Sequence, residues 1–201
     1  MAFFKSVGCV MYLIIFVFLL FAIIAYKTSK RINDLDEIKI KRHDPLAMPG
    51  TPEWKGQDGE RKVQRILSCL PKQNYIVLND VLIPTKAGTT QLDHVVVSIF
   101  GLFIIETKNY SGKIYGGENS DQWTEYLAGQ KYVFYNPIRQ NYGHAQAVAK
   151  YTHVDPCYIF PIVVFTGSAI IKSNVGEQAV LIDHLFETIT HYKNKFLQWS
   201  K

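Results

Sequence analysis

The sequence predicts an α/β fold, a sandwich of helices around a mixed sheet, preceded by one transmembrane helix. Two observations lead to this prediction. Residues Val7–Tyr26 carry no charge, and 19 of these 20 residues are apolar. After this run the apolar pattern changes period in the order helix, strands, helix, strand, helix, which is typical of an α/β domain. The length of 201 residues and the composition exclude several large domains, a disordered chain and a multi-span transporter.

The apolar run is long enough to cross a membrane, because 20 helical residues span about 30 Å. The alternative is a cleaved secretory signal, which would place the rest of the chain outside the cytoplasm. The apolar region of such a signal spans only about 7–15 residues, and Ala22 and Ala25 do not form the expected cleavage site. We expect an uncleaved anchor. Three basic residues lie within residues 27–31, whereas Lys5 precedes the run, so the domain is expected to be cytoplasmic.

The chain then divides into a short tail, the anchor, a charged linker and one folded domain, at residues 1–6, 7–26, 27–50 and 51–201. Three cysteines without a CxxC or Cys/His metal spacing argue against a disulfide scaffold. We interpret Cys69 and Cys157 as buried free thiols. The net charge of +5 is compatible with a nucleic-acid partner but does not demonstrate one.

The first helix of the domain is expected to begin at Thr51, a hydroxyl N-cap followed by proline at the first helical position. It is expected to end near Leu70, before the next proline. An apolar stripe with helical spacing starts at Val63. Gly56 and Gly59 are poor helix formers and would allow another backbone or a ligand to come close.

Strand-like runs follow at Tyr75–Ile83, Gln91–Val97, Leu102–Thr107, Lys113–Tyr115 and Lys131–Tyr135. A second helix is expected from Asn136-Pro137 to about Tyr151, again with a cap and a proline. An apolar strand at Tyr158–Phe165 and a helix at Leu181–Trp199 complete the order.

Strand alternation brings charged side chains together. Glu106 and Lys108 share one face of their strand, and Asp93 lies on the preceding strand. If the turn is centred between Ile99 and Phe100, paired residue numbers sum to 199 and Asp93 lies opposite Glu106. Two opposed carboxylates repel each other unless something compensates their charge.

A divalent cation is the obvious compensation, because Mg²⁺ binds carboxylate oxygens, water and phosphate. Lys108 would then orient or help to deprotonate a water molecule, which is the chemistry of metal-assisted phosphodiester hydrolysis. Two alternatives stay open. Ile99 and Phe100 are poor residues for a tight turn, and a slip of one residue would put the two acids on opposite faces. Lys108 could also form only a salt bridge at the strand end.

Several short motifs in order resemble the NERD (nuclease-related) domain family, a branch of the PD-(D/E)xK restriction-endonuclease-like superfamily. The resemblance covers about residues 51–170. The matching segments are Gly56-Gln57-Asp58-Gly59-Glu60, Gln91-Leu92-Asp93-His94-Val95-Val96-Val97, Gly101-Leu102-Phe103-Ile104-Ile105-Glu106-Thr107-Lys108, Ser111-Gly112-Lys113-Ile114, Trp123 and Asn136-Pro137-Ile138-Arg139-Gln140. Leu92 stands where the superfamily name has proline.

The resemblance implies an αβββαβ core and nuclease chemistry, with less information about the substrate. Together with the apolar run, it leads us to expect a membrane-anchored nuclease that acts on DNA, with RNA as the alternative substrate. The resemblance also implies Mg²⁺ or Mn²⁺ held by Asp93, Glu106 and the backbone carbonyl of Thr107. It implies Lys108 as the catalytic lysine of the Glu-x-Lys element. Glu60 would be the acidic residue of the first helix, and Gln140 would reach the site from the later helix.

Other candidate side chains have ordinary structural interpretations. Gln140 and His144 lie four residues apart and so share a helix face; a site role is plausible for Gln140, whereas His144 is more often a structural or capping residue. Trp123 and the tyrosines at 132, 135 and 142 would be able to stack on bases, although packing in the core or at its rim is the more common role. A non-catalytic binding or scaffolding module on the same fold is the competing function.

Overall fold

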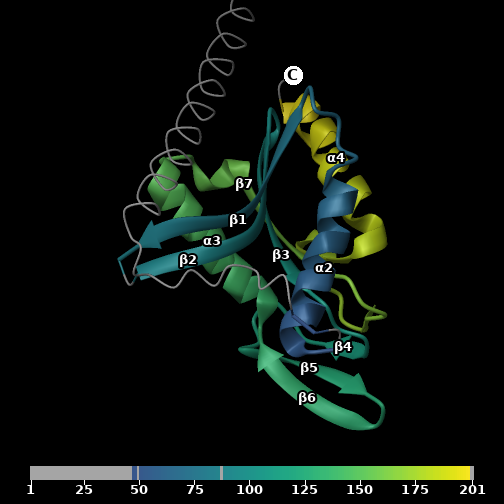
Figure 1. The fold of residues 1–201 in the computed structure, drawn as a ribbon. Coiled ribbons are helices and arrows are strands. Elements are labelled where there is room, and N and C mark those ends of the chain that lie inside the picture. Colours follow the sequence, from purple (N-terminus) through teal and green to yellow (C-terminus); the bar gives the residue numbers. More distant parts are fainter. Residues whose placement is uncertain (1–46, 49, 87, 200–201) are drawn as a thin grey trace, which may run out of the picture.

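The computed structural model describes residues 47–48, 50–86 and 88–199, with side chains described up to residue 192. Figure 1 shows its fold. In chain order the elements are α2 (Pro52–Leu67), β1 (Tyr75–Thr85), β2 (Gly88–Ser98), β3 (Gly101–Lys108), β4 (Lys113–Tyr115), β5 (Gln122–Leu127), β6 (Gln130–Tyr135), α3 (Pro137–Thr152), the 3-10 turn η1 (Pro156–Tyr158), β7 (Ile159–Phe165), β8 (Ile170–Ile171), the 3-10 turn η2 (Gly176–Gln178), β9 (Ala179–Leu181) and α4 (Ile182–Trp199).

Both predicted helix starts are confirmed. The Thr51 side chain accepts a hydrogen bond of 3.2 Å from the Trp54 N–H at the start of α2. The Asn136 side chain caps α3 in the same way and accepts from the Ile138 N–H at 2.9 Å. Helix α2 ends at Leu67, earlier than predicted. Its last turn tightens before the proline, because the Leu70 N–H donates to the Leu67 carbonyl three residues back.

The first sheet has five strands in the order β1-β2-β3-β7-β9. Strands β1, β2 and β3 are antiparallel, whereas β7 and β9 run parallel to β3. The predicted mixed sheet is therefore present. The order α2, β1, β2, β3, α3, β7 corresponds to the expected αβββαβ core, with β4, β5 and β6 inserted before α3.

Helices cover both faces of this sheet. On one face, Phe103 and Ile105 of β3 pack with Val63 of α2 and Leu185 of α4. On the other face, Ile104 packs with residues of α3, including Val148. Figure 1 shows the same arrangement, with α2 beside α4 and with α3 across the sheet from them. The predicted alternation along β3 is confirmed, and it directs Glu106 and Lys108 towards the α3 side.

The turn between β2 and β3 has the predicted position, with Ser98 paired to Gly101 across Ile99 and Phe100. Gly101 takes the positive φ of +136°. The positive-φ residues of the described chain do not include Ile99 or Phe100. A Cβ at Gly101 would lie 2.5 Å from the Phe160 ring, so both the space and the backbone favour glycine here.

A second sheet was not predicted. It has the order β6-β5-β4-β8, so β4 belongs to this sheet and not to the first. Its inner face packs through Ile114 and Trp123 onto Phe165 of β7. Strand β5 was not predicted, because Glu125 lies on this buried face and interrupts the apolar alternation. Strands β8 and β9 span two and three residues, which is too short for a periodic pattern.

Two other sequence predictions have different outcomes. The anchor at residues 7–26 lies outside the described residues; within those residues, no helix has the length and apolar character of a membrane span. Cys69 and Cys157 are free, as predicted, but the prediction that they are buried is wrong, because both are exposed. Cys69 lies in the turn after α2, and Cys157 lies in η1. Apolar neighbours in the sequence do not guarantee burial in such turns.

Candidate functional site

The candidate site lies where β2 and β3 separate, at the ends far from their shared turn. The strand pairing ends with His94 opposite Ile105, in the predicted register. Asp93 and Glu106 are the next pair in this register, just beyond the pairing. Here the Asp93 carboxylate accepts a hydrogen bond of 2.7 Å from the Thr107 N–H. A side chain thus takes the place of a backbone partner, and this contact holds Asp93 beside the segment that carries Glu106.

The pKa values of the two carboxyl groups are shifted in opposite directions. Burial and the negative charge of Glu106 raise the pKa of Asp93 from 3.8 to about 7. Burial would also raise the pKa of Glu106, but contacts with His144 and Lys108 outweigh burial and lower it below the usual value. The positive groups of the site therefore stabilise the Glu106 carboxylate, but they are not sufficient to keep Asp93 ionised to the usual extent as well.

Lys108 is held on the same face of β3 by two side chains. Its Nζ donates to Glu106 Oε1 at 2.8 Å and to Gln140 Oε1 at 3.0 Å. Gln140 Nε2 in turn donates to Glu106 Oε1 at 2.8 Å. These three residues form a closed hydrogen-bonded group between β3 and α3. Gln140 reaches the group from the later helix, in the position that the resemblance implied, and the alternative of a strand-end salt bridge is present as part of the same group.

His144 also contacts the group, although we expected a structural or capping role. Its Nε2 lies 3.4 Å from Glu106 Oε2, and its Nδ1 lies 2.9 Å from the Thr90 hydroxyl of β2. The sequence signal was the spacing of four residues from Gln140, which places both side chains on one face of α3. What the sequence did not reveal is Thr90, because it lies three residues before Asp93 and belongs to no recognised motif.

Helix α2 approaches the site from the other side of the sheet. The negative charge of Glu60 contributes to the raised pKa of Asp93. A Cβ on Gly59 would lie 2.8 Å from the Thr166 hydroxyl, so this glycine allows the close approach that was predicted. At Gly56, no neighbouring atom lies within 4 Å of such a Cβ, so the predicted approach of another backbone is absent among the described residues. The Asn109 side chain donates to the Lys55 carbonyl at 2.7 Å and ties the start of α2 to the end of β3.

The residues present fit a divalent cation. Asp93, which is partly buried, and Glu106, which is buried, offer carboxylate oxygens, the ligands that Mg²⁺ prefers. The raised pKa of Asp93 identifies a place where added positive charge is favourable. Among the described residues, no group of three or more His, Cys, Asp and Glu side chains is placed to hold a metal. Two carboxylates suffice for Mg²⁺, which completes its coordination with water and phosphate.

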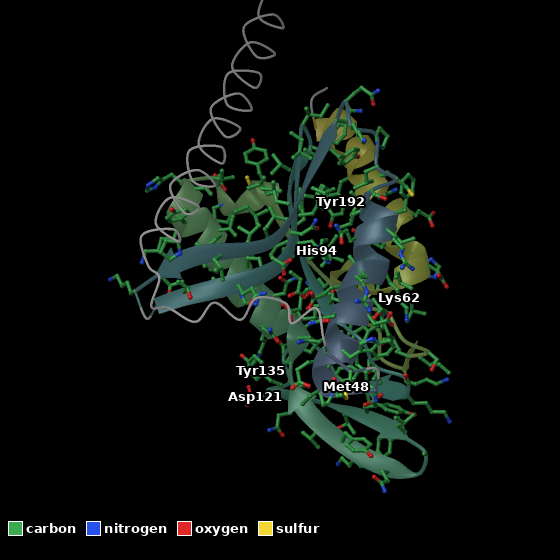
Figure 2. All side chains as sticks on the ribbon, in the orientation of Figure 1. Met48, Lys62, His94, Asp121, Tyr135 and Tyr192 are labelled. Carbon is green, nitrogen blue, oxygen red and sulfur yellow. The ribbon has the colours of Figure 1, made fainter. Side chains whose placement is uncertain are left out.

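Other motif residues hold the second sheet in place. Asn136 is fully buried, and its side-chain amide donates to the carbonyls of Gly117, Glu118 and Ser120 at 3.1, 3.0 and 2.6 Å. Arg139 contacts Asp121 just before β5. Figure 2 shows Asp121 and Tyr135 close together at the end of this sheet. The Asn-Pro segment is therefore a structural junction between the second sheet and the helix that carries Gln140.

The aromatic candidates separate into two groups. Trp123 is fully buried and stacks on Phe165, with ring centroids 6.1 Å apart, so it is a core residue. Tyr132, Tyr135 and Tyr142 are exposed by 47%, 58% and 58%. The expectation of core packing is confirmed for the tryptophan but is wrong for these tyrosines. Tyr135 pairs with Gln122 on the face opposite Trp123, whereas Tyr132 pairs with Glu125 on the same face as Trp123 and is nevertheless exposed.

A mixed α/β sheet in which neighbouring strands carry an aspartate and a Glu-x-Lys element is typical of the PD-(D/E)xK nuclease-like superfamily. Within this class, the model of the nuclease-related domain family, NERD, matches residues 55–166, which is more than half of the chain. The chain therefore belongs to the NERD family. This membership indicates a nuclease-related function.

The chain is 47% identical over 98 residues to an uncharacterized protein of Bacillus anthracis, covering 48% of this chain and 46% of that protein. The chain thus spans about half the length of this curated relative. Two solved structures are each 15% identical in sequence to the present chain and superpose on it with a TM-score of 0.36. They are the protein of unknown function AF1548, with coverage of 63% of this chain and 56% of that one, and VC1899 from Vibrio cholerae, with coverage of 72% and 34%.

Proposed function

We propose that the protein is a metal-dependent nuclease that hydrolyses phosphodiester bonds of DNA at the site formed by Asp93, Glu106 and Lys108. The observation that carries this proposal is a buried and a partly buried carboxyl group on neighbouring strands, with a lysine beside them. Membership of a nuclease-related family supports the same chemistry. Glu60 and Gln140 complete the proposed catalytic set.

Asp93 and Glu106 would hold Mg²⁺ or Mn²⁺, with the Thr107 backbone carbonyl as a further oxygen ligand. When bound, the ion would supply Lewis-acid stabilisation of the negative charge on the phosphate. The side chains of the protein provide the orientation. Gln140 holds both Lys108 Nζ and Glu106 Oε1, so the lysine ammonium is kept beside a carboxylate that would bind the ion.

Lys108→Ala and Lys62→Ala form a matched test of this proposal. Each lysine pairs with a carboxylate, Lys108 with Glu106 at 2.8 Å and Lys62 with Asp58 at 2.7 Å, but Lys62 lies on the surface of α2. With the full chain, Mg²⁺ and a labelled DNA, we expect Lys108→Ala to reduce cleavage by about 10²–10⁴-fold and Lys62→Ala to leave it unchanged. Undiminished cleavage by a folded Lys108→Ala protein would reject the role of this residue.

The second candidate function is a non-catalytic nucleic-acid-binding or scaffolding module. It is favoured by the direct salt bridge between Lys108 and Glu106, which compensates one of the two carboxylates without a metal. This candidate predicts that the full chain binds DNA but does not cleave it with Mg²⁺ or Mn²⁺. It also predicts that calorimetric titration with either ion gives no heat of binding.

We further propose that residues 7–26 anchor the protein in a membrane, with residues 51–201 on the cytoplasmic side. The support is the uncharged apolar run and the basic residues that follow it. Membrane fractionation together with protease protection tests this topology. A mature N-terminus that begins after the apolar run would instead establish a cleaved signal.

A further inference from the structure

The outer face of the second sheet carries tyrosines and lysines together. Directly paired residues of neighbouring strands share one face of a sheet. The pairing places Lys113 of β4 opposite Tyr126 of β5, and Tyr126 opposite Lys131 of β6. By the same pairing and alternation, Tyr115 and Tyr135 lie on this face. We call it the tyrosine face; it is made up of Tyr115, Tyr126, Tyr135, Lys113 and Lys131, together with the exposed apolar side chains of Val133 and Ile170.

These tyrosines are unusually exposed. Tyr115, Tyr126 and Tyr135 keep 43%, 45% and 58% of their surface accessible, whereas Trp123 on the opposite face of the same sheet keeps none. Tyr115 and Tyr126 contact each other edge to face, with ring centroids 5.6 Å apart. A row of exposed aromatic rings on a sheet is a platform on which flat groups can stack.

The charges on this face are positive. The carboxylate of β5, Glu125, points to the inner face, where it accepts hydrogen bonds of 2.9 Å from both the Ser111 and the Gly112 N–H. Asp121, just before β5, is paired with Arg139. Lysine is also depleted in the interfaces between proteins, so the combination with tyrosine favours a phosphate-bearing partner over a protein.

The tyrosine face is joined to the candidate site through the chain itself. Lys108 ends β3, and five residues later Lys113 begins β4. Tyr135 ends β6, and Gln140 follows within the first turns of α3. The strands that carry the tyrosine face are therefore connected by short segments to the two elements that carry Lys108 and Gln140.

We propose that the tyrosine face binds single-stranded DNA, with bases stacked on the tyrosines and phosphates beside the lysines. A duplex hides its base faces, so stacking of this kind selects unpaired strands. The choice of DNA rests on the proposed nuclease function. The binding itself requires neither a metal nor Asp93 and Lys108, so it is measured independently of cleavage.

The test uses the full chain in EDTA and a fluorescently labelled thymidine oligonucleotide, with binding followed by anisotropy. Loss of one stacked base is expected to weaken binding by about 5–100-fold in Tyr126→Ala and in Tyr135→Ala. Tyr126→Phe, which keeps the ring, should bind as the wild type does. Tyr158→Ala is the matched control, because Tyr158 is also exposed, by 41%, but precedes β7 at the other end of β3.

The lysines allow a second test of the same surface. Plots of log affinity against log salt concentration have a negative slope, and Lys113→Ala and Lys131→Ala are each expected to make that slope shallower by about 0.7. Equal affinity in Tyr126→Ala, Tyr135→Ala and Tyr158→Ala would overturn the proposal. Tighter binding of a duplex of the same length would also overturn it. If the tyrosine variants bind the oligonucleotide unchanged but lose self-association, the tyrosine face is a protein interface and the proposal is wrong.

Discussion

The two sheets of this protein differ in how their faces are covered, and each contains residues that are unexpected for its own environment. The first sheet is packed by helices on both faces, yet it carries the partly buried carboxyl group of Asp93 and the buried one of Glu106. The second sheet is covered on one face, yet it exposes Tyr126 and Tyr135 on the other. Burial of a charge is costly without a compensating partner, and an exposed aromatic patch is typical of a binding surface. This difference is the reason why we propose chemistry for the first sheet and recognition for the second.

The largest expected change in the free energy of unfolding comes from a comparison of the buried and exposed faces of the second sheet. Trp123→Ala removes a fully buried ring that packs on Phe165, and we expect a loss of about 3–5 kcal/mol in the free energy of unfolding. Tyr135→Ala, on the exposed face, should change it by less than about 0.5 kcal/mol. Urea unfolding of the full-chain variants measures both. Similar losses would mean that the outer face is also part of a packed core.

A smaller effect is expected where α2 meets the first sheet. Gly59→Ala would place a Cβ 2.8 Å from the Thr166 hydroxyl, and the resulting shift of the helix should cost about 1–3 kcal/mol. Gly56→Ala meets open space and should stabilise the helix by about 0.5–1 kcal/mol. Thermal unfolding of the two variants compares them directly. Opposite signs support the close approach of α2 to β3, whereas two stabilised variants would contradict it.

A pH-dependent effect concerns the partly buried carboxyl group of Asp93. Its pKa of about 7 in the folded protein lies above the ordinary 3.8, so the folded state holds the proton more tightly than the unfolded chain. This contribution to stability is complete below about pH 4 and is lost as the pH rises through about 7. In EDTA, we expect the Tm of the wild type to fall over this range by several degrees more than that of Asp93→Asn, because a pKa shift of this size corresponds to a few kcal/mol. Parallel pH profiles would contradict the raised pKa.

The sequence predicted most of the first sheet, although not β9, because local rules determine it. Strand alternation placed Glu106 and Lys108 on one face of their strand. The register followed from a two-residue turn whose positive φ falls on Gly101, so Ile99 and Phe100 did not need an unfavourable backbone. Helical spacing placed Gln140 and His144 on one face of α3, and both reach Glu106; the contact of Gln140 was expected only from the family resemblance, and that of His144 was not expected.

The second sheet could not be predicted in the same way. Glu125 is buried because it binds two backbone N–H groups, at Ser111 and Gly112, and this tertiary contact has no local pattern. The pairing of β4 with β8 joins segments more than 50 residues apart. The exposure of Cys157 and Tyr135 likewise depends on which faces the helices leave uncovered, and periodicity within one segment does not contain that information.

The rate of DNA cleavage by the full chain as a function of Mg²⁺ concentration, in the wild type and in Asp93→Asn, tests the central claim most directly. The proposed site predicts cleavage that rises with Mg²⁺, stops in EDTA and falls by at least about 10²-fold in the folded variant, because the variant loses one of two carboxylate ligands. Cleavage that continues in EDTA, or that survives in Asp93→Asn, would contradict the assignment of this site.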